Sequence, residues 1–405
     1  MSLKNDNEKM SRILSGLICL LTAALPAIAT AETTAEEVTQ HYVEMAVERF
    51  GRTHDLARKL QQAIDDFVAA PSVKSHKRVK RAWLRAHKAY SQTEVYRFGN
   101  PNVDDWDGKI NAWPLDEGLI DYVASGYLHE FGNPYAKWNI IASRMPLYGS
   151  IIEEISSGTD PKAGPQGMAD FESNVAIGFH AIEFLLWGQD LNKQPGDAGL
   201  RSHTDYLLGD ACTNGNCKRR GEYLKAASRI LSRDLMLATN DWKTQNKRLY
   251  ATRFLELPVE EQLGRMLQGM GEMSSGELAG ERTRVALISS DQEEEQSCFS
   301  DTTQHAIYYN ALGVQSLYLG SDESVSLSAL VKQMDASLDE EMRSAFSRSM
   351  RRAEAVRDSS VPFDEMIQPE NEKGRQQIKD LIAALKAQTM VMEKIQARIP
   401  ELAAL

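Results

Sequence analysis

The sequence predicts an all-α protein. In the stretch 221–242, apolar side chains recur at steps of three and four residues. The stretch 378–395 has the same spacing, which places its apolar side chains on one face of a helix. The sequence lacks alternating polar and apolar stretches of useful length, which would indicate strands. These observations favour a protein built from packed helices.

Proline residues separate the expected helices, because proline ends or kinks a helix. We expect helices at residues 34–70, 74–98, 135–157, 167–189, 219–246, 259–289, 302–318, 324–354 and 371–397. Between two of them, the stretch 98–135 is rich in Gly, Asn, Asp, Trp and Pro. Its aromatic residues predict an ordered loop packed on the core, and long ordered loops often carry function.

The N-terminus has the features of a secretory signal peptide. Basic residues precede the apolar stretch 13–29, and Ala29-Thr30-Ala31 has the small-x-small pattern of a cleavage site. We therefore expect residues 1–31 to be removed and the rest of the protein to be exported. A retained membrane anchor is one alternative, and a lipoprotein modified at Cys19 is another.

The chain that follows the signal peptide is long enough for two helical lobes. Gly, Pro and polar residues concentrate near residues 190–220, which indicates a boundary. We expect an N-terminal lobe at 32–190, a connecting loop at 191–220 and a C-terminal lobe at 221–405.

Two cysteines of the connecting loop are close in sequence. Cys212 and Cys217 are predicted to form a short disulfide in an oxidising compartment, and a metal-binding pair is the alternative. Cys298 then has no partner once Cys19 is removed with the signal peptide.

The charge of the chain is acidic. Its 57 Asp and Glu against 46 Lys and Arg give a net charge of −11. This charge argues against nucleic-acid binding and is compatible with the handling of cations. The acidic run 293–295 is typical of a solvated face, and a cation site is the alternative.

The stretch 175–188 reads VAIGFHAIEFLLWG, in which His180 and Glu183 are the only ionisable residues. A helix that is apolar all round is buried, and a buried carboxylate needs a hydrogen bond, an opposite charge or a metal. Fourteen residues are too few for a membrane span, which needs about 20. His180, Glu183 and Trp187 share one stripe of this helix, so His180 and Glu183 can bind one metal.

Other carboxylates are needed to complete such a metal site. Glu94 and Asp116 are the candidates, and one imidazole with several carboxylates suits iron, manganese or zinc. In the alternative interpretation, Glu94 pairs with Arg97 at the surface and Asp116 caps a helix. The HExxH pattern of zinc proteases is absent, which weakens a hydrolase interpretation.

The segment GFHAIEFLLWG resembles the Gly-x-His-x-x-Glu signature of imelysin-like proteins. The segments 83–99, 110–121 and 281–320 are also similar to this family, and the last is similar to its iron-regulated, insulin-cleaving-protease-like branch. The resemblance implies an exported protein of two helical lobes, with the signature near their junction and a role in bacterial iron acquisition. It further implies a location in the periplasm or at the outer membrane.

The resemblance also implies roles for single residues. Gly178, His180 and Glu183 match the signature, and Glu94, Trp113 and Asp116 match segments that should face it. Further residues that we expect to bind a ligand or to support the site are Arg97, Trp187, Arg282, Ser297, Asp301 and His305.

Three functions are compatible with these residues. The first is metal binding without catalysis, with iron as the expected ion, zinc or another divalent ion as the alternative, or a small iron-related ligand. A membrane-bound uptake partner belongs to this hypothesis. The second is a zinc peptidase, a name also used in the family, with Glu94 as general base. In the third, His180 and Glu183 pair with Arg97 or Arg282 between the lobes without any metal.

Overall fold

The computed structural model describes residues 32–127, 131–147, 152, 171–191 and 198–405. The predicted signal peptide lies outside these residues. Thr33–Leu405 forms one compact unit. Its described residues form helices and turns and no strand, which confirms the all-α prediction. In this part of the chain, no helix is long and apolar enough to span a membrane.

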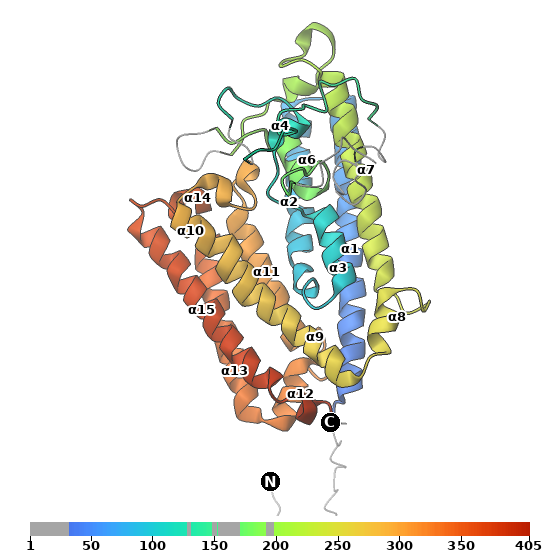
Figure 1. The fold of residues 1–405 in the computed structure, drawn as a ribbon, viewed down its shortest axis with the longest axis vertical. Helices are drawn as coiled ribbons and strands as arrows, with labels where there is room; N and C mark the ends of the chain where they lie inside the picture. Colours follow the sequence, from blue (N-terminus) through green and yellow to red (C-terminus); the bar gives the residue numbers. More distant parts are fainter. Residues whose placement is uncertain (1–31, 128–130, 148–151, 153–170, 192–197) are drawn as a thin grey trace, which may run out of the picture. The chain divides into compact units, whose positions relative to one another are not determined.

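A first group of helices packs around a buried central helix, α6 (Gly178–Trp187). The long helix α1 (Ala35–Ala69) packs on both α2 (Val73–Ser91) and α7 (Cys217–Asp241). Helix α6 contacts α2 and α7, while α3 (Pro101–Ile110) packs on α7 (Figure 1). These helices form the lobe that carries the His180–Glu183 pair.

The second group of helices follows in sequence. It consists of α9 (Val259–Gly271), η5 (Glu272–Val285), α10 (Ala286–Ser289), α11 (Thr303–Leu319), α12 (Leu327–Met334), α13 (Ala336–Arg357) and α15 (Glu372–Gln396). Helix α13 packs between α11 and α15, and η5 contacts α11 and α15 (Figure 1). The two groups meet where α11 packs on α2 and α9 packs on α1. Gly313 of α11 allows this approach, because a Cβ there would lie 2.8 Å from the carbonyl oxygen of Gln92.

Short helices connect these elements. They are η1 (Glu94–Tyr96), α4 (Glu117–Ile120), η3 (His203–Tyr206), η4 (Gly209–Ala211), α8 (Tyr250–Leu255), η6 (Gln292–Glu294), η7 (Cys298–Ser300), α14 (Phe363–Met366) and α16 (Ile399–Leu402).

Side chains that cap the helices fix where the first two begin. The Thr34 hydroxyl accepts the backbone N–H of Glu37, whose carboxylate accepts the N–H of Thr34, so α1 starts with a capping box. Ser72 and Ser75 form the same reciprocal arrangement before α2. The predicted starts at residues 34 and 74 therefore lie within one residue of the observed ones.

The helix expected at 135–157 is not formed over residues 135–147, while residue 152 is helical. Residues 135–147 form turns, and most of the rest of the prediction lies outside the described residues. The backbone N–H groups of Asn139, Ile140 and Ile141 donate to the carbonyl oxygens of residues 118–120 in α4. Apolar spacing alone indicated a helix, but this segment satisfies its amides by pairing with a distant element.

Other predicted boundaries also differ from the structure. The helix expected at 167–189 is observed as α6, Gly178–Trp187, and the described residues 171–177 are not helical. The helix expected at 74–98 ends at Ser91, and the loop expected at 98–135 contains α3 and α4. The helix expected at 324–354 is divided at Asp335, which has a φ of −159° and caps α13 with its side chain. Proline at the start of α3 fits the first helical turn, where no amide donor is needed.

Helix α7 packs on α1 and α6, in the first group of helices. The predicted division assigns this helix to the C-terminal lobe. The lobe boundaries at 190–191 and 220–221 stay a prediction, since Thr33–Leu405 is one compact unit.

Candidate functional site at the junction of the two helix groups

Glycine is required at the start of α6. Gly178 has a φ of +88°, and a Cβ there would lie 2.8 Å from the carbonyl oxygen of Ile110. The backbone of α6 thus approaches the end of α3 more closely than a side chain would permit. The hydroxyl of Tyr223 in α7 donates to the carbonyl oxygen of Ala176 at 2.7 Å and anchors the preceding segment.

His180 and Glu183 are fully buried one turn apart on α6. His180 Nδ1 lies 2.8 Å from Glu183 Oε2. The other carboxylate oxygen, Glu183 Oε1, accepts the backbone N–H of Ser300 at 3.0 Å and its hydroxyl at 2.6 Å. His180 Nε2 is buried and has no hydrogen-bond partner among the described residues. Hydrogen bonds therefore hold both oxygens of Glu183, whereas Nε2 of His180 is left unpaired.

A second histidine, His87, lies beside His180. The rings of His87, on α2, and His180 have centroids 5.3 Å apart. His87 Nε2 lies 3.2 Å from Asn111 Oδ1, so this nitrogen donates to the amide oxygen. The amide nitrogen of Asn111 in turn donates to Glu94 Oε2 at 3.3 Å.

Glu94 links the two groups of helices. Its carboxylate pairs with Arg282 of η5 at 2.5 Å and accepts the side-chain amide of Asn310 in α11 at 2.8 Å. Arg282 also donates to Glu277 and to Asn310. The side chains of Glu94 and Arg282 are buried, so the ion pair is shielded from solvent.

Burial sets the protonation of both histidines. It lowers the pKa of His180 to about 3, with Arg282 acting in the same direction and Glu94 against it. Burial lowers the pKa of His87 to about 3 as well. Both imidazoles are neutral at neutral pH. Burial raises the pKa of Glu183 to about 8, and its bonds to Ser300 oppose this shift.

The structure places Asp116 in a different network. Its carboxylate accepts hydrogen bonds from Tyr127 at 2.8 Å, from Asn133 at 2.6 Å and from Ser173 at 2.7 Å. The Asp116 side chain makes no cap hydrogen bond to α4. Of the four residues expected to bind a metal, His180, Glu183 and Glu94 thus share one region, and Asp116 holds neighbouring loops together.

Arg97 and Arg282 do not pair with the His180–Glu183 side chains in the described part of the chain. Arg97 pairs with Asp104 at 2.5 Å, with Asp107 at 3.2 Å and with Glu277 at 3.8 Å. Glu277 therefore joins Arg97 to Arg282. Arg97 also lines a cleft of about 710 Å³ between the η1–α3 segment and α9.

The other expected residues lie at several places. Trp187 packs at the far end of α6, edge-on to Trp83 at 5.4 Å, and Trp113 is half-buried before a cis proline. Ser297 is buried, and its backbone N–H donates to Thr303 at 2.9 Å. His305 is half-buried on α11, and burial lowers its pKa to about 4, assisted by Lys88 and Arg357.

Comparison with known proteins identifies the family. A family model described as imelysin, peptidase M75, matches residues 46–392, which is most of the chain. The chain belongs to the imelysin family.

Relatives of this imelysin have names connected with iron. A segment of 64 residues is 33% identical to iron-regulated protein A of Synechococcus elongatus and covers 16% of this chain and 18% of that relative. A solved structure of a putative iron-regulated protein A precursor from Parabacteroides distasonis is 18% identical, with a TM-score of 0.66. The match covers 90% of this chain and 95% of that one.

A second solved structure has the same kind of fold. An imelysin-like protein from Psychrobacter arcticum is 13% identical over 88% of this chain and 93% of that one, with a TM-score of 0.51. Both structural matches fall below 25% identity and therefore support the imelysin-like helical fold alone.

Sequence reasoning missed four residues of the imelysin junction: His87, Asn111, Ser300 and Asn310. A signal for His87 was present, because Val79, Trp83 and His87 follow four-residue steps on the buried face of α2. The partners of Asn111, Ser300 and Asn310 come from segments far along the chain, and spacing within one helix carries no information about them.

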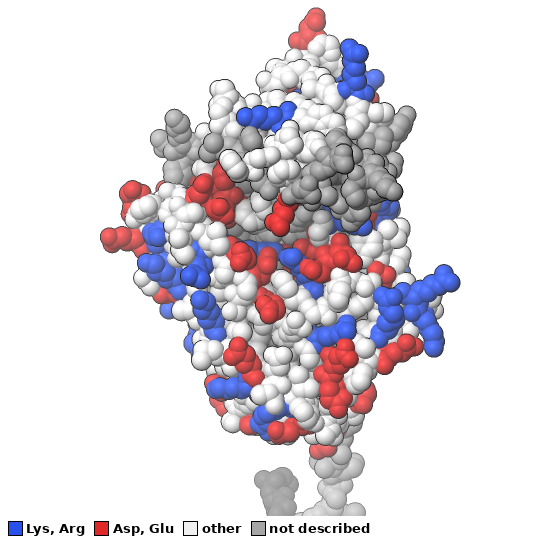
Figure 2. Space-filling model, viewed as in Figure 1, with Lys and Arg blue, Asp and Glu red and all other residues white. Residues whose placement is uncertain are grey.

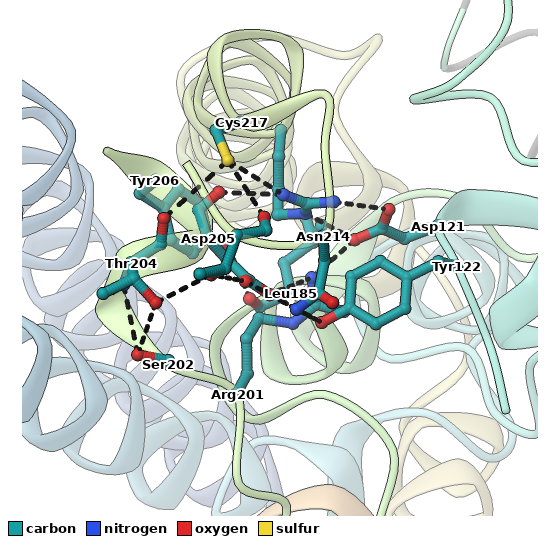
Figure 3. A network of polar contacts seen from close by, with 12 residues as sticks. Asp121, Tyr122, Leu185, Arg201, Ser202, Thr204, Asp205, Tyr206, Asn214 and Cys217 are labelled. Carbon is teal, nitrogen blue, oxygen red and sulfur yellow. Dashed lines mark hydrogen bonds and ion pairs between the residues drawn. The ribbon is translucent and has the colours of Figure 1, made fainter. Parts of the chain in front are cut away.

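A separate polar network holds the end of α6 and the start of α7 in this imelysin (Figure 3). Asp121 pairs with Arg201 at 2.5 Å and with Arg220 at 2.6 Å. Asp205 accepts from Tyr122 and Asn214, so two buried aspartates face two buried arginines. The hydroxyl of Tyr206 donates to the carbonyl oxygen of Leu185, one of the free carbonyls that end α6.

The predicted disulfide is part of the same region. Cys212 and Cys217 are bonded, and Cys217 is the first residue of α7. Cys298 is a buried free thiol whose pKa is raised well above the ordinary value, chiefly by burial. A thiol in this environment is a poor nucleophile.

Proposed function

We propose that this imelysin binds an iron ion at His180 and serves in bacterial iron acquisition. The observation that carries the proposal is His180 Nε2, a fully buried nitrogen without a hydrogen-bond partner among the described residues. An unpaired polar atom in a protein interior costs free energy unless a ligand satisfies it. A metal ion bound at this nitrogen would do so.

The surroundings of His180 have the features of a metal ligand. A carboxylate at the Nδ1 side orients the ring and directs the other nitrogen toward the ion, as in carboxylate–histidine–metal arrangements. Glu183 therefore positions His180. The lowered pKa keeps the imidazole neutral. In the tautomer whose Nδ1–H donates to Glu183 Oε2, the lone pair of Nε2 is available for an ion.

Further donors come from α2 and η1, in the first group of helices. His87 lies beside His180, and Glu94 is the nearest carboxylate whose charge acts on both imidazoles. To bind the ion, Glu94 would exchange one of its hydrogen bonds to Asn111, Arg282 or Asn310. Imidazole with carboxylate suits iron, manganese or zinc, and the names of the relatives favour iron.

A small iron-related ligand would find space in the cleft lined by Arg97. This cleft of about 710 Å³ is lined by Arg97 and Arg265 and by the carboxylates of Asp104, Glu261 and Glu272. Arg97 connects the cleft to the His180 region through Glu277 and Arg282. Export to the periplasm or the outer membrane and a membrane-bound uptake partner complete the proposal.

The family model is described as a peptidase, and a zinc peptidase is the second candidate function. The side chains of His180 and Glu183 are both 0% exposed. Their burial favours a single ion over a polypeptide, which would have to reach the metal. Chelator-sensitive cleavage of an unfolded protein, lost in Glu183→Gln, would support the peptidase instead.

Metal analysis of matched histidine variants tests the proposal. Purified protein is incubated with Fe²⁺ without oxygen, desalted and assayed for bound iron. Wild type and His54→Gln, a half-buried histidine of α1, should retain equal iron, while His180→Gln retains at least about ten-fold less. Glutamine can still reach Glu183, and circular dichroism checks the fold. Equal iron in His180→Gln and wild type would contradict the proposal.

A further inference from the structure

Three carboxyl groups converge at a second place, outside the His180 region. Glu295 follows η6, Asp301 follows η7, and Asp364 lies in α14. One oxygen from each of these side chains lies within 4.8 Å of the other two. Among the described residues, this is the one group of three His, Cys, Asp or Glu side chains that meets this distance. We call Glu295, Asp301 and Asp364 the acidic triad.

The elements that carry the triad are held against one another. Gln368, just after α14, donates to the carbonyl oxygen of Ser290 at 3.4 Å, and Arg375 donates to the Ser290 hydroxyl at 3.0 Å. Figure 1 shows α14 beside α10, which ends before Ser290. In Figure 2, acidic side chains gather on the same part of the surface.

Glu295 is the decisive member, because it is buried and no opposite charge is among the main causes of its pKa shift. Its residue is 1% exposed, and neither of its carboxyl oxygens has a hydrogen-bond partner in the described structure. Its sequence neighbours 293 and 294 predicted a solvated face, and that prediction is wrong for Glu295. A buried carboxylate that faces two other carboxyl groups is unfavourable unless a cation or bound protons neutralise it.

The electrostatics of Glu295 lack a positive partner. Burial raises its pKa well above the ordinary value, and Asp364 and Asp301 raise it further, while Thr303 opposes the shift. Among the described residues, the charges that act most strongly on its carboxylate are those of Asp364, Asp301 and Asp190, all of them negative. Two more buried oxygens of the same segment, Gln296 Oε1 and Ser297 Oγ, also have no hydrogen-bond partner.

We propose that the acidic triad is a binding site for a divalent cation that prefers carboxylate oxygens, such as Mn²⁺ or Ca²⁺. Its donors are all oxygens, in contrast to the imidazoles near His180, and this donor set suits hard cations. The site is independent of the proposed iron site, because the two share no residue.

The triad is nevertheless connected to His180 through a short segment. Ser300 donates to Glu183 with both its N–H and its hydroxyl, and Asp301 is the next residue. A cation bound by Asp301 fixes the segment that orients Glu183. The cation site would then act as a structural support for the junction.

Titration with Mn²⁺ tests this proposal. Chelator-treated protein carrying His180→Gln, which removes the proposed iron ligand, is titrated while electron paramagnetic resonance measures free Mn²⁺. We expect one tightly bound Mn²⁺ that Ca²⁺ displaces. Asp301→Asn should weaken binding by at least about ten-fold. Asparagine suits this position, because residue 301 has a φ of +50°, which asparagine tolerates. Glu365→Gln, on the same short helix as Asp364, should bind like its parent.

A second variant and a second measurement keep the outcome decisive. Asp364→Asn replaces Asp301→Asn if the latter does not fold, and thermal melting is recorded with and without Mn²⁺. The cation should raise the melting temperature of the parent and not that of the triad variant. Absence of tight Mn²⁺ binding in the parent would overturn the proposal, as would equal binding by parent and triad variant.

Discussion

His87 and His180 are neutral imidazoles in a protein interior, and this determines how the protein responds to acid. Both have a pKa lowered to about 3, against about 6.5 in an unfolded chain. Between these values the unfolded state binds protons that the folded state does not. The full contribution of each histidine to the free energy of unfolding is therefore present above pH 6.5. This contribution decreases as the pH falls toward 3.

This gives a prediction for His87→Gln, in which the amide can still donate to Asn111. Between pH 6 and pH 4, the unfolding free energy of wild type should fall more steeply than that of the variant, by up to about 1.4 kcal/mol per pH unit. Urea denaturation at several pH values measures both slopes. Parallel curves would show that His87 is not held neutral by burial.

Glu183 contributes to the pH dependence of the unfolding free energy with the opposite sign. Its pKa is raised to about 8, so its contribution to stability is present at low pH and is lost as the pH rises from about 4.5 toward 8. The comparison of wild type with His87→Gln cancels this shared contribution, because both proteins retain Glu183.

Helix α6 is the element whose sequence was most informative. Its unbroken apolar residues predicted burial, and all ten of its residues are buried. That burial made a partner for His180 and Glu183 necessary. Ser300 supplies one for Glu183, while His180 Nε2 has no hydrogen-bond partner among the described residues. Residues 135–147 show where such reasoning from apolar side chains fails. Their spacing predicted a helix, but backbone amides of this segment pair with α4 instead.

The glycine of the signature is a second testable feature of this element. Gly178→Ala should lower the unfolding free energy by about 1–3 kcal/mol, because alanine is strained at a φ of +88° and its Cβ would contact the Ile110 carbonyl. Chemical denaturation measures this loss.

Gly108 of α3 is the matched control. A Cβ at Gly108 would meet no atom within 4 Å. Gly108→Ala should therefore leave stability unchanged or raise it by about 0.5–1 kcal/mol through helix propensity. Equal destabilisation by the two variants would indicate that the conformation of Gly178 is not required.

At the scale of the whole molecule, the site exists because two groups of helices meet. Glu94 and Asn111 come from the first group, while Arg282 and Asn310 come from the second. Helical periodicity predicted most of the helices of both groups, since it is a local property of the chain. Pairings over such distances in sequence depend on how the groups pack, so single-chain patterns could not identify them.

The dependence of such pairings on packing also explains why the sequence did not predict the acidic triad or the partners of Asp116. The need for further carboxylates and the resemblance of its segment to the family predicted that Asp116 lies with His180, whereas its contacts are to Tyr127, Asn133 and Ser173. Glu295 was expected in solvent as part of an acidic run, yet the packing of α14 buries it beside Asp364. Local sequence gave the residue types in both cases, and the tertiary fold decided their partners.

Anomalous diffraction can show whether iron binds at His180. Crystals grown with Fe²⁺ are measured on both sides of the iron absorption edge, and the difference map locates the ion. The account predicts a peak within bonding distance of His180 Nε2, with His87 or Glu94 beside it. An iron peak only at the acidic triad, or no peak at His180 in iron-loaded crystals, would contradict it.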